Sequence, residues 1–441
     1  MLRKLRARGH PAEHASTTMQ VAAVGVVAVT AWVLVAHVFK SPWHRYFDLG
    51  IYRSAVIWWL HGRPLYDFPR PHAGFGFTYP PFAAVVLSPL AAVGLRVAGA
   101  VHTIASLVVL AVTTWWLMKP VARRAGWPLW FAVGLALPVI VGSDPVREAM
   151  GWGQVGLFLA ALVLADVVAL RRGYRWAGVG IGLATAFKLT PGLFLVYLVL
   201  TRRWRAAAVA AGTFVAATGL TAALAPRASW QYWVHALWET SRVGDPVTSG
   251  NQSLLGMLDR FVRPAHPSGV LWALLAVGVL VVSLSRAVRA HRCGDELVGV
   301  TLVGFASCLL SPIAWSHHLY WVVPAGIVLL DVAAGARLST AAPAVVRQRE
   351  RTVRRAALAG LVLLVAVFWA NPMFIAYGTC GGLCSSFPGD LAQNAFGLAM
   401  IALVLLLPIR EPAELGAVPL RASRAGARTP VPPRPGGSSP R

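Results

Sequence analysis

Apolar segments follow one another along almost the whole chain, separated by short polar or basic turns. A helix needs about 20 predominantly apolar residues to cross the hydrocarbon layer of a bilayer. Backbone inside that layer must satisfy its own hydrogen bonds, which favours helices. We therefore expect an all-α polytopic membrane protein. The apolar segments are 21–38, 79–95, 97–118, 128–142, 154–170, 174–187, 189–201, 205–224, 269–288, 297–313, 318–336, 356–371 and 391–409.

The basic turns predict which segments cross the membrane. Cytoplasmic loops carry an excess of Lys and Arg. Twelve net crossings place the turn at Arg123–Arg124, the turn at Arg171–Arg172 and the cluster at 347–355 inside, whereas thirteen place them all outside. We therefore expect a bundle of about twelve transmembrane helices. Segment 79–95, which contains Pro80 and Pro81, is then a re-entrant or surface helix on the outer side.

This topology divides the chain into three parts. Residues 1–20 form a cytoplasmic basic arm, and 21–409 form the membrane catalytic domain. Residues 410–441, rich in Pro, Gly and Ser towards their end, form a disordered cytoplasmic tail. Segment 21–38 has no small-residue cleavage site after it, so we interpret it as an uncleaved anchor. Both termini are then cytoplasmic, and the larger outer loops are about 40–78, 143–153, 225–268 and 372–390.

Composition and charge agree with a membrane protein. Hydrophobic residues make up 57% of the chain and charged residues 13%, yet the formal net charge is +24. Such a charge is compatible with nucleic acid, with anionic lipid or with membrane topology. Because little of the chain is soluble and most basic residues fall on the inner side, we interpret the charge as a topology signal. Membrane lipids are expected partners, and nucleic acid is not.

The four cysteines predict one disulfide and no metal site. Cys380 and Cys384 share an outer loop in an oxidising compartment, which favours a disulfide between them. That loop contains no histidine and no second cysteine pair, so a zinc site is not expected. Cys293 and Cys308 lie in a cytoplasmic turn and a span, and both should be unpaired.

Acidic and histidine side chains in the outer loops point to chemistry on the outer face. Asp48 follows the first span in an aromatic setting that could raise its pKa towards that of a general base. The alternative is an aspartate that pairs with Arg45 or Arg53, or that caps a short helix.

Lys188 and a histidine pair are further candidates. A lysine at membrane depth is costly unless it is paired or faces water, although Lys188 could also be an anchor that snorkels to the interface. His317 and His318 point about 100° apart on a helix, so only one should face a given cavity. An interfacial histidine bonded to a backbone carbonyl is the alternative, and adjacent histidines form a poor metal-chelating pair.

Several motifs together carry a family resemblance. The chain resembles glycosyltransferase family 87, the actinobacterial polyprenol-phosphate-mannose-dependent α-(1→2)-mannosyltransferases of the GT-C fold. The resemblance extends in order over about 40–325, with one departure: Gly156 stands where the family commonly has Asn. It rests on Asp48-Leu-Gly-Ile-Tyr52, Gly62-Arg-Pro-Leu-Tyr66, Tyr79-Pro-Pro-Phe82, Gly153-Gln154-Val155, Lys188-Leu-Thr-Pro191, Asn251-Gln252-Ser253-Leu254 and Ser316-His317-His318.

The resemblance implies a reaction at the outer face of the plasma membrane. Mannose would pass with inversion from polyprenyl-phosphate mannose to a lipid-anchored glycan such as a phosphatidylinositol mannoside, lipomannan or lipoarabinomannan. Asp48 matches the catalytic base, and a phosphate leaving group needs positive charge or hydrogen-bond donors. Lys188 and one of His317 or His318 are candidates to supply them. No metal or other cofactor is required.

The remaining motif residues are expected near the same site. Asn251 and Gln252 either bind sugar hydroxyls or phosphate oxygens, or they cap their own loop. Tyr52, Tyr79 and Gln154 are expected to support the site.

Two other functions remain open at this point. One is transfer of another polyprenyl-phosphate sugar such as arabinofuranose. The other is a non-enzymatic flippase or transporter of lipid-linked glycans, which would need charged residues along a path between the two faces.

Overall fold

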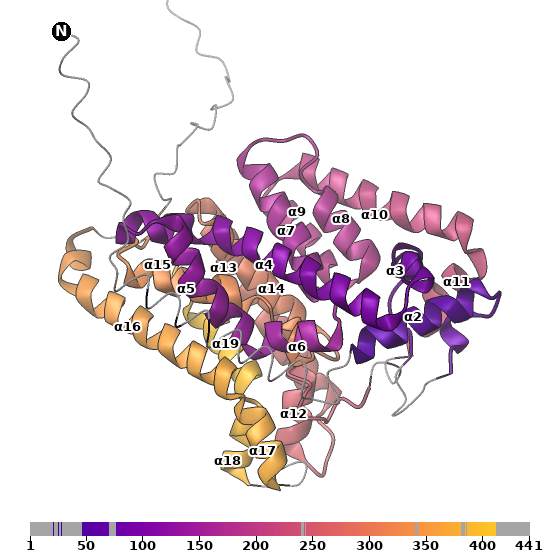
Figure 1. Ribbon diagram of the computed structural model, residues 1–441. Coiled ribbons are helices and arrows are strands. Elements are labelled where there is room, and N and C mark those ends of the chain that lie inside the picture. The colour runs from indigo at the N-terminus through magenta and orange to yellow at the C-terminus, as the bar shows by residue number, and fades with distance from the viewer. Residues whose placement is uncertain are drawn as a thin grey trace, which may run out of the picture.

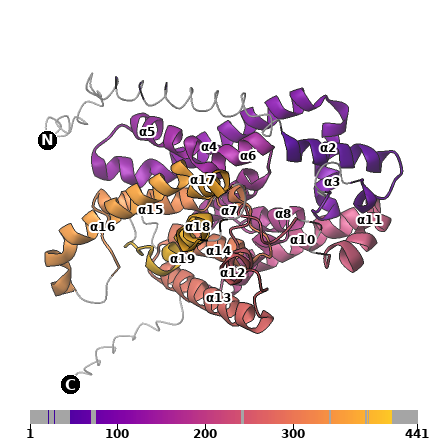
Figure 2. The same ribbon diagram turned by 90° about the horizontal axis from the view of Figure 1, so that it is seen from below.

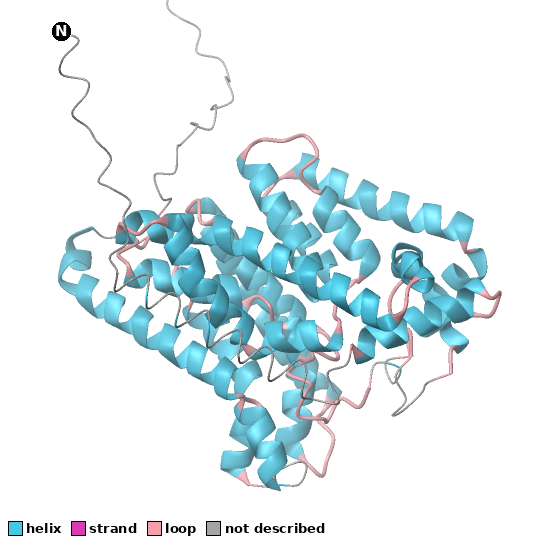
Figure 3. Cartoon of the chain, viewed as in Figure 1, coloured by secondary structure: helices cyan, strands magenta, loops and turns pink. Residues whose placement is uncertain are grey.

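The computed structural model describes residues 46–411, apart from 70–75, 240, 241, 243, 340–342, 381–383 and 385, together with Val21, Gly25 and Ala28. The expected basic arm, most of the first apolar segment and the tail from residue 412 onwards lie outside the described residues. The regular elements of the described part are all helices (Figure 3), and its only extended pairings are two isolated bridges. The all-α expectation is therefore confirmed.

The helices differ widely in length. Short 3₁₀ or π turns, named η, connect several of them. In chain order the elements are α2 (Phe47–Leu60), η2 (Leu65–Asp67), α3 (Pro81–Leu87), η3 (Ser88–Ala92), α4 (Leu95–Ala125), α5 (Leu129–Gly142), α6 (Asp144–Trp152), α7 (Gly156–Arg171), α8 (Val179–Phe187), η4 (Thr190–Gly192), α9 (Leu193–Leu200), α10 (Trp204–Leu224), α11 (Pro226–Gln231), η5 (Tyr232–Ala236), α12 (Leu254–Val262), α13 (Gly269–Arg292), α14 (Glu296–Leu310), η7 (Ser316–His318), α15 (Val322–Ala333), α16 (Pro343–Ala370), α17 (Pro372–Cys380), α18 (Phe387–Gln393) and α19 (Ala395–Leu406).

The protein is a multi-pass membrane protein, but about twelve crossings are not confirmed. In the described residues, four helical stretches are long and apolar enough to span: α4, α10, α13 and Glu350–Cys380. The bent pairs α5–α6 and α18–α19 raise the number to six if each is one span. Several of the other expected crossings form helices of fewer than 18 residues, which are too short to cross unaided.

One face of α4 shows why these helices belong in lipid. The apolar side chains at 97, 101, 104, 108 and 112 recur at helical spacing, and between 54% and 64% of their surface is exposed. A continuous apolar stripe of this length is rare on a soluble monomer. Lipid tails would cover this stripe in the membrane.

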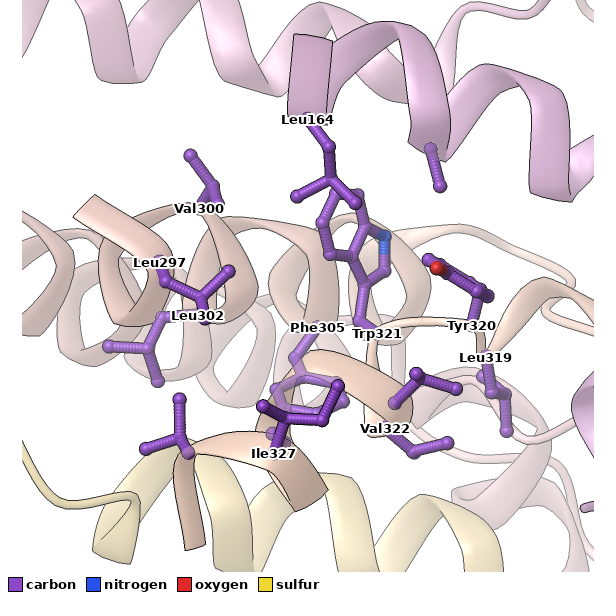
Figure 4. Packing of buried hydrophobic residues seen from close by; sticks show 14 of the residues in the cluster. Leu164, Leu297, Val300, Leu302, Phe305, Leu319, Tyr320, Trp321, Val322 and Ile327 are labelled. Carbon is purple, nitrogen blue, oxygen red and sulfur yellow. The ribbon is translucent and has the colours of Figure 1, made fainter. Parts of the chain in front are cut away.

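The larger hydrophobic core includes buried residues of α7, α14 and α15. Leu297 and Phe305 of α14, Leu164 of α7 and Trp321, which precedes α15, belong to one buried hydrophobic cluster (Figure 4). The elements α2, α3 and α11 lie together at one end of the molecule, whereas α16 begins at the other end (Figures 1 and 2).

Several segments that the sequence predicts to be spans or loops form short helices. The expected re-entrant segment contains α3 and η3, and the expected outer loop 143–153 is mostly α6, bent 67° from α5. Residues 174–187 and 189–201 contain α8 and α9, which are separated at Lys188 and η4. The break follows from Pro191, which lacks the backbone N–H that a continuous helix would use.

A buried ion network fixes the end of the described chain. Arg410 donates from Nη2 to Asp295 at 2.7 Å and from Nη1 to Asp331 at 3.0 Å. Asp331 also accepts from Nε of Arg124 at 2.8 Å. These contacts tie the segment after α19 to α4, α14 and α15.

Replacing Arg410 by methionine should therefore lower the free energy of unfolding by about 3–5 kcal/mol, because the buried Asp295 loses its charged partner and Asp331 keeps only Arg124. Unfolding of the purified protein in detergent micelles measures this change. The matched control is Arg354→Met. Arg354 pairs with Glu350 at 3.3 Å, and both side chains are 46% exposed, so the expected loss is less than about 1 kcal/mol. Equal losses in the two variants would contradict the assigned role of Arg410.

Candidate active site

Asp48 lies in the first turn of α2, and its carboxylate is held by Gln154. Nε2 of Gln154 donates to Oδ2 of Asp48 at 2.6 Å. Of the two arginines considered as partners, Arg45 lies outside the described residues. Nε of Arg53 donates instead to the backbone carbonyls of Leu90 and Val93. Pairing with Arg53 is therefore excluded as the reason for the aspartate.

Two tyrosines extend this contact into a hydrogen-bonded chain. The hydroxyl of Tyr79 donates to Oε1 of Gln154 at 3.2 Å, and it lies 3.0 Å from the hydroxyl of Tyr52. A ring nitrogen of His102 contacts the backbone carbonyl of Gln154 at 3.0 Å. Both tyrosines and Gln154 are buried. The structure thus brings together the three residues expected to support Asp48.

A close approach between α2 and α6 makes the Gln154 contact possible. Gly153 ends α6 with φ 76°, and a Cβ atom there would lie 2.6 Å from Cβ of Leu49. Only glycine combines this backbone conformation with so little space. The backbone N–H of Tyr46 also donates to the carbonyl of Gly151 at 3.0 Å. Gly153 therefore sets Gln154 beside the first turn of α2.

The surroundings of Asp48 shift its pKa towards neutral pH, where proton transfer takes place. Burial raises the pKa of Asp48 to about 6, although the Gln154 hydrogen bond and the charge of Lys188 both act to lower it. A carboxylate with this pKa is mostly ionised at pH 7 and is a stronger base than an exposed aspartate.

Lys188 lies at the break between α8 and η4, and it contacts His318. Its Nζ is 2.9 Å from Nε2 of His318 and 5.3 Å from the centre of the Tyr79 ring. Burial lowers the pKa of Lys188 to about 8, while the negative charge of Asp48 acts against that change. The lysine is therefore paired with other groups of the site.

The hydrogen bonds of His318 determine where its proton lies. Nδ1 accepts from the backbone N–H of Trp315 at 3.2 Å. A neutral imidazole has one donor and one acceptor nitrogen, so Nε2 carries the proton. Nε2–H and the ammonium group of Lys188 are then both donors, so neither satisfies the other across their 2.9 Å contact, and both need an acceptor. Such a pair suits an oxyanion such as a phosphate group.

A small pocket, partly open to the outside, adjoins these two residues. Lys188 and His318 line it, and His317 does not. The rings of the two histidines are perpendicular, with centroids 4.7 Å apart. The structure therefore shows which histidine faces this pocket, a question that the sequence left open. Its apolar wall includes Leu159, Val163, Phe194, Ile313 and Trp321.

Asn251 and Gln252 lie in the fold with their amide groups bonded to backbone. Nδ2 of Asn251 donates to Pro246 and Pro312, and its Oδ1 accepts from Ser253 and Ala314. Nε2 of Gln252 donates to Ser249 and Gln393, and its Oε1 accepts from Gly397. Both side chains are fully buried. These contacts favour the alternative in which the pair holds its own loop.

Sequence reasoning assigned no role to α6, although it supports the histidine turn. Oδ2 of Asp144 accepts from Asn371 at 2.5 Å and from Arg147 at 3.3 Å. Helix α6 packs against η7, which contains Ser316 and the two histidines. Asp144 is fully buried. The sequence signal was an acidic residue directly after an apolar helix, followed by Pro145.

The cysteines form one disulfide, and one free cysteine, Cys308, lines the pocket beside Lys188 and His318. Cys380 and Cys384 are joined by a disulfide, and Cys293 and Cys308 are free. Within the described ranges, no group of three or more His, Cys, Asp or Glu side chains could hold a metal ion.

Comparisons with known proteins show the family of the chain. The model of glycosyltransferase family 87 matches residues 77–312. A Mycobacterium tuberculosis protein named polyprenol-phosphate-mannose-dependent α-(1-2)-phosphatidylinositol mannoside mannosyltransferase is 34% identical over 314 residues, covering 68% of this chain and 72% of that protein. A protein of the same name from Mycolicibacterium smegmatis is 33% identical over 304 residues, covering 64% and 69%.

A third relative carries a related name. It is a Mycobacterium tuberculosis protein named as a phosphatidylinositol pentamannoside mannosyltransferase with the same type of donor. It is 33% identical over 344 residues, covering 74% of this chain and 75% of that protein. No solved structure matches the chain. The family match extends over more than half of the sequence, so the chain belongs to glycosyltransferase family 87.

Proposed function

We propose that this chain transfers mannose from polyprenyl-phosphate mannose to a lipid-anchored glycan, forming an α-(1→2) linkage with inversion. The acceptor is a phosphatidylinositol mannoside or a lipoglycan related to it. The proposal rests on how the base, the two donors and the pocket are arranged. The carboxylate of Asp48 lies near the Lys188–His318 donor pair, and that pair stands beside a pocket with an apolar wall. The names of the relatives support the same donor and acceptor.

The proposed reaction is a direct displacement. Asp48 accepts the proton of an acceptor hydroxyl. At the same time, the oxygen of that hydroxyl forms a bond to C1 of the mannosyl group. The bond between C1 and the phosphate oxygen breaks, and polyprenyl phosphate leaves with the electron pair. Lys188 and Nε2–H of His318 stabilise the negative charge on that phosphate. The apolar wall of the pocket suits the start of the isoprenoid chain.

We place the reaction on the outer face of the plasma membrane. The basic residues at the ends of long helices support this side. Arg123 and Arg124 lie in the last turn of α4, and Arg289 and Arg292 lie in the last turn of α13. By the positive-inside rule, those ends are cytoplasmic. Asp48 lies in α2, which is at the end of the molecule with α3 and α11 (Figure 1).

The test is donor specificity of the purified protein with a phosphatidylinositol mannoside as acceptor. Synthetic polyprenyl-phosphate mannose should give a product extended by one α-(1→2)-mannose. GDP-mannose and polyprenyl-phosphate arabinofuranose should give none. Mass spectrometry and α-mannosidase digestion of the glycolipid identify the product. Transfer of arabinofuranose instead of mannose would overturn the proposed donor.

The pH dependence of kcat/KM should be bell-shaped. Asp48 acts as a base only when deprotonated, so activity should rise as pH increases through about 6. Lys188 stabilises the phosphate only when protonated, so activity should fall as pH increases through about 8. Initial rates from about pH 4.5 to 9.5 measure both limbs. In Lys188→Arg, the alkaline limb should move to higher pH. A descending limb at the same pH in that variant would contradict the role of Lys188.

A further inference from the structure

His317 is a buried ring with an unused nitrogen. Only 8% of the surface of this residue is exposed, and Nε2 has no hydrogen-bond partner among the described residues. His318 differs, because its Nδ1 accepts from Trp315 and its Nε2 lies 2.9 Å from Nζ of Lys188. An unpaired buried polar group costs about 1–3 kcal/mol. A bound molecule that contacts Nε2 would remove this cost.

The ring of His317 is neutral, and Lys188 and Glu148 act on it with opposite charges. Burial lowers the pKa of His317 to about 3; the charge of Lys188 lowers it further, and that of Glu148 acts in the other direction. Glu148 belongs to α6, which packs against η7. The Nε2 atom therefore has an acidic side chain nearby and offers hydrogen bonding without a charge of its own.

The neighbouring part of α6 leads back to the catalytic carboxylate. The indole N–H of Trp152 donates to Glu148 at 2.6 Å, and the Trp152 ring meets the ring of Phe47 edge-on at 5.7 Å. Phe47 directly precedes Asp48. A group bound between η7 and α6 would thus be close to the first turn of α2.

We propose that Nε2 of His317 binds a hydroxyl group of the acceptor glycan beside Glu148 and Trp152, so that the two adjacent histidines serve different substrates. This inference rests on the proposed mannosyl transfer. His318 lines the pocket with Lys188 and serves the donor phosphate, whereas His317 is absent from that lining. The charge of Lys188 is already assigned to the donor phosphate through His318. The carboxylate of Glu148, which lies 3.9 Å from Nε of Arg147, can accept a hydrogen bond from a sugar hydroxyl, and this favours an uncharged polyol at His317. An indole adds the apolar face against which sugar rings pack.

The experiment compares His317→Asn with His317→Gln. The amide of Gln reaches the position of Nε2, and the amide of Asn is one methylene shorter. With a phosphatidylinositol mannoside and polyprenyl-phosphate mannose as substrates, Asn should raise the acceptor KM about tenfold, which corresponds to one lost hydrogen bond. Gln should keep the acceptor KM within about threefold of the original, and both variants should leave the donor KM within about twofold. His318→Gln is the matched control, and it should raise the donor KM instead.

Each other outcome has a defined meaning. An increase of the donor KM in His317→Asn, or equal increases of both KM values, would overturn the acceptor assignment. An unchanged acceptor KM would overturn it as well. If His317→Asn does not fold, Glu148→Gln is tested instead. An increase of the donor KM alone, or equal increases of the donor and acceptor KM, in that variant would overturn the acceptor assignment. Failure of the unsubstituted protein to transfer mannose would instead overturn the proposed function, and thermal unfolding separates that result from loss of fold.

Discussion

Asp48→Asn should lower kcat of mannosyl transfer by at least about a hundredfold. General base catalysis contributes about 10²- to 10⁴-fold, and an amide cannot accept the proton of the attacking hydroxyl. The asparagine oxygen can still accept from Nε2 of Gln154, a contact now measuring 2.6 Å. Folding and donor binding should therefore change little. Radioactive mannose transfer to a phosphatidylinositol mannoside measures the rate.

The matched control for Asp48→Asn is Asp67→Asn. Asp67 lies in η2 on the same side of the fold, and it accepts from Gln231 at 2.6 Å. This exposed contact is outside the proposed reaction, so the rate should stay within about twofold of the original. Protein level and thermal unfolding should be normal in both variants. Retention of more than half the activity in Asp48→Asn would exclude the aspartate as the base.

Lys188→Met should lower kcat about 10²- to 10³-fold, the usual effect of removing one donor to a developing negative charge. Methionine fills much of the same volume, but it leaves Nε2–H of His318 as the remaining donor of the pair. Lys188→Arg should recover part of the lost rate because it restores the charge. Initial rates at saturating acceptor and varied donor concentration give kcat and the donor KM separately, and so measure this effect.

Lys119→Met is the matched control for Lys188→Met. Lys119 lies towards the basic end of α4, away from Asp48. We expect a rate within about twofold of the original there. Equal rate losses at positions 119 and 188 would show that the effect is a general consequence of removing a lysine from a membrane protein.

Several parts of the site could be predicted because local sequence carries the chemistry. Asp48 and Lys188 were recognisable as charged residues at the ends of apolar segments. The break beside Lys188 follows from Pro191, three residues later. The contact between Gln154 and Asp48 could not be derived, because it joins positions 106 residues apart through the close packing of α2 and α6. That packing depends on the space available at Gly153, which hydrophobic periodicity does not report.

The number of membrane crossings could not be predicted from the sequence for a different reason. Hydropathy identifies apolar residues, but it does not distinguish a lipid-exposed span from a short helix packed inside the protein. Helix α14 illustrates the problem: it has 15 residues, and most of them are buried. The roles of Asn251 and Gln252 were open for a similar reason, since an amide that binds a sugar and one that binds its own loop look alike in sequence.

The ion network around Arg410 has a consequence for biosynthesis. A ribosome makes the chain from its N-terminus, so Asp295 and Asp331 enter the membrane before their arginine at position 410 exists. Asp331 can pair with Arg124 in the meantime, whereas Asp295 must remain near the aqueous boundary, or bind a proton, until Arg410 is made. A nascent chain that stops before this point carries an uncompensated Asp295, a defect that membrane quality control can detect.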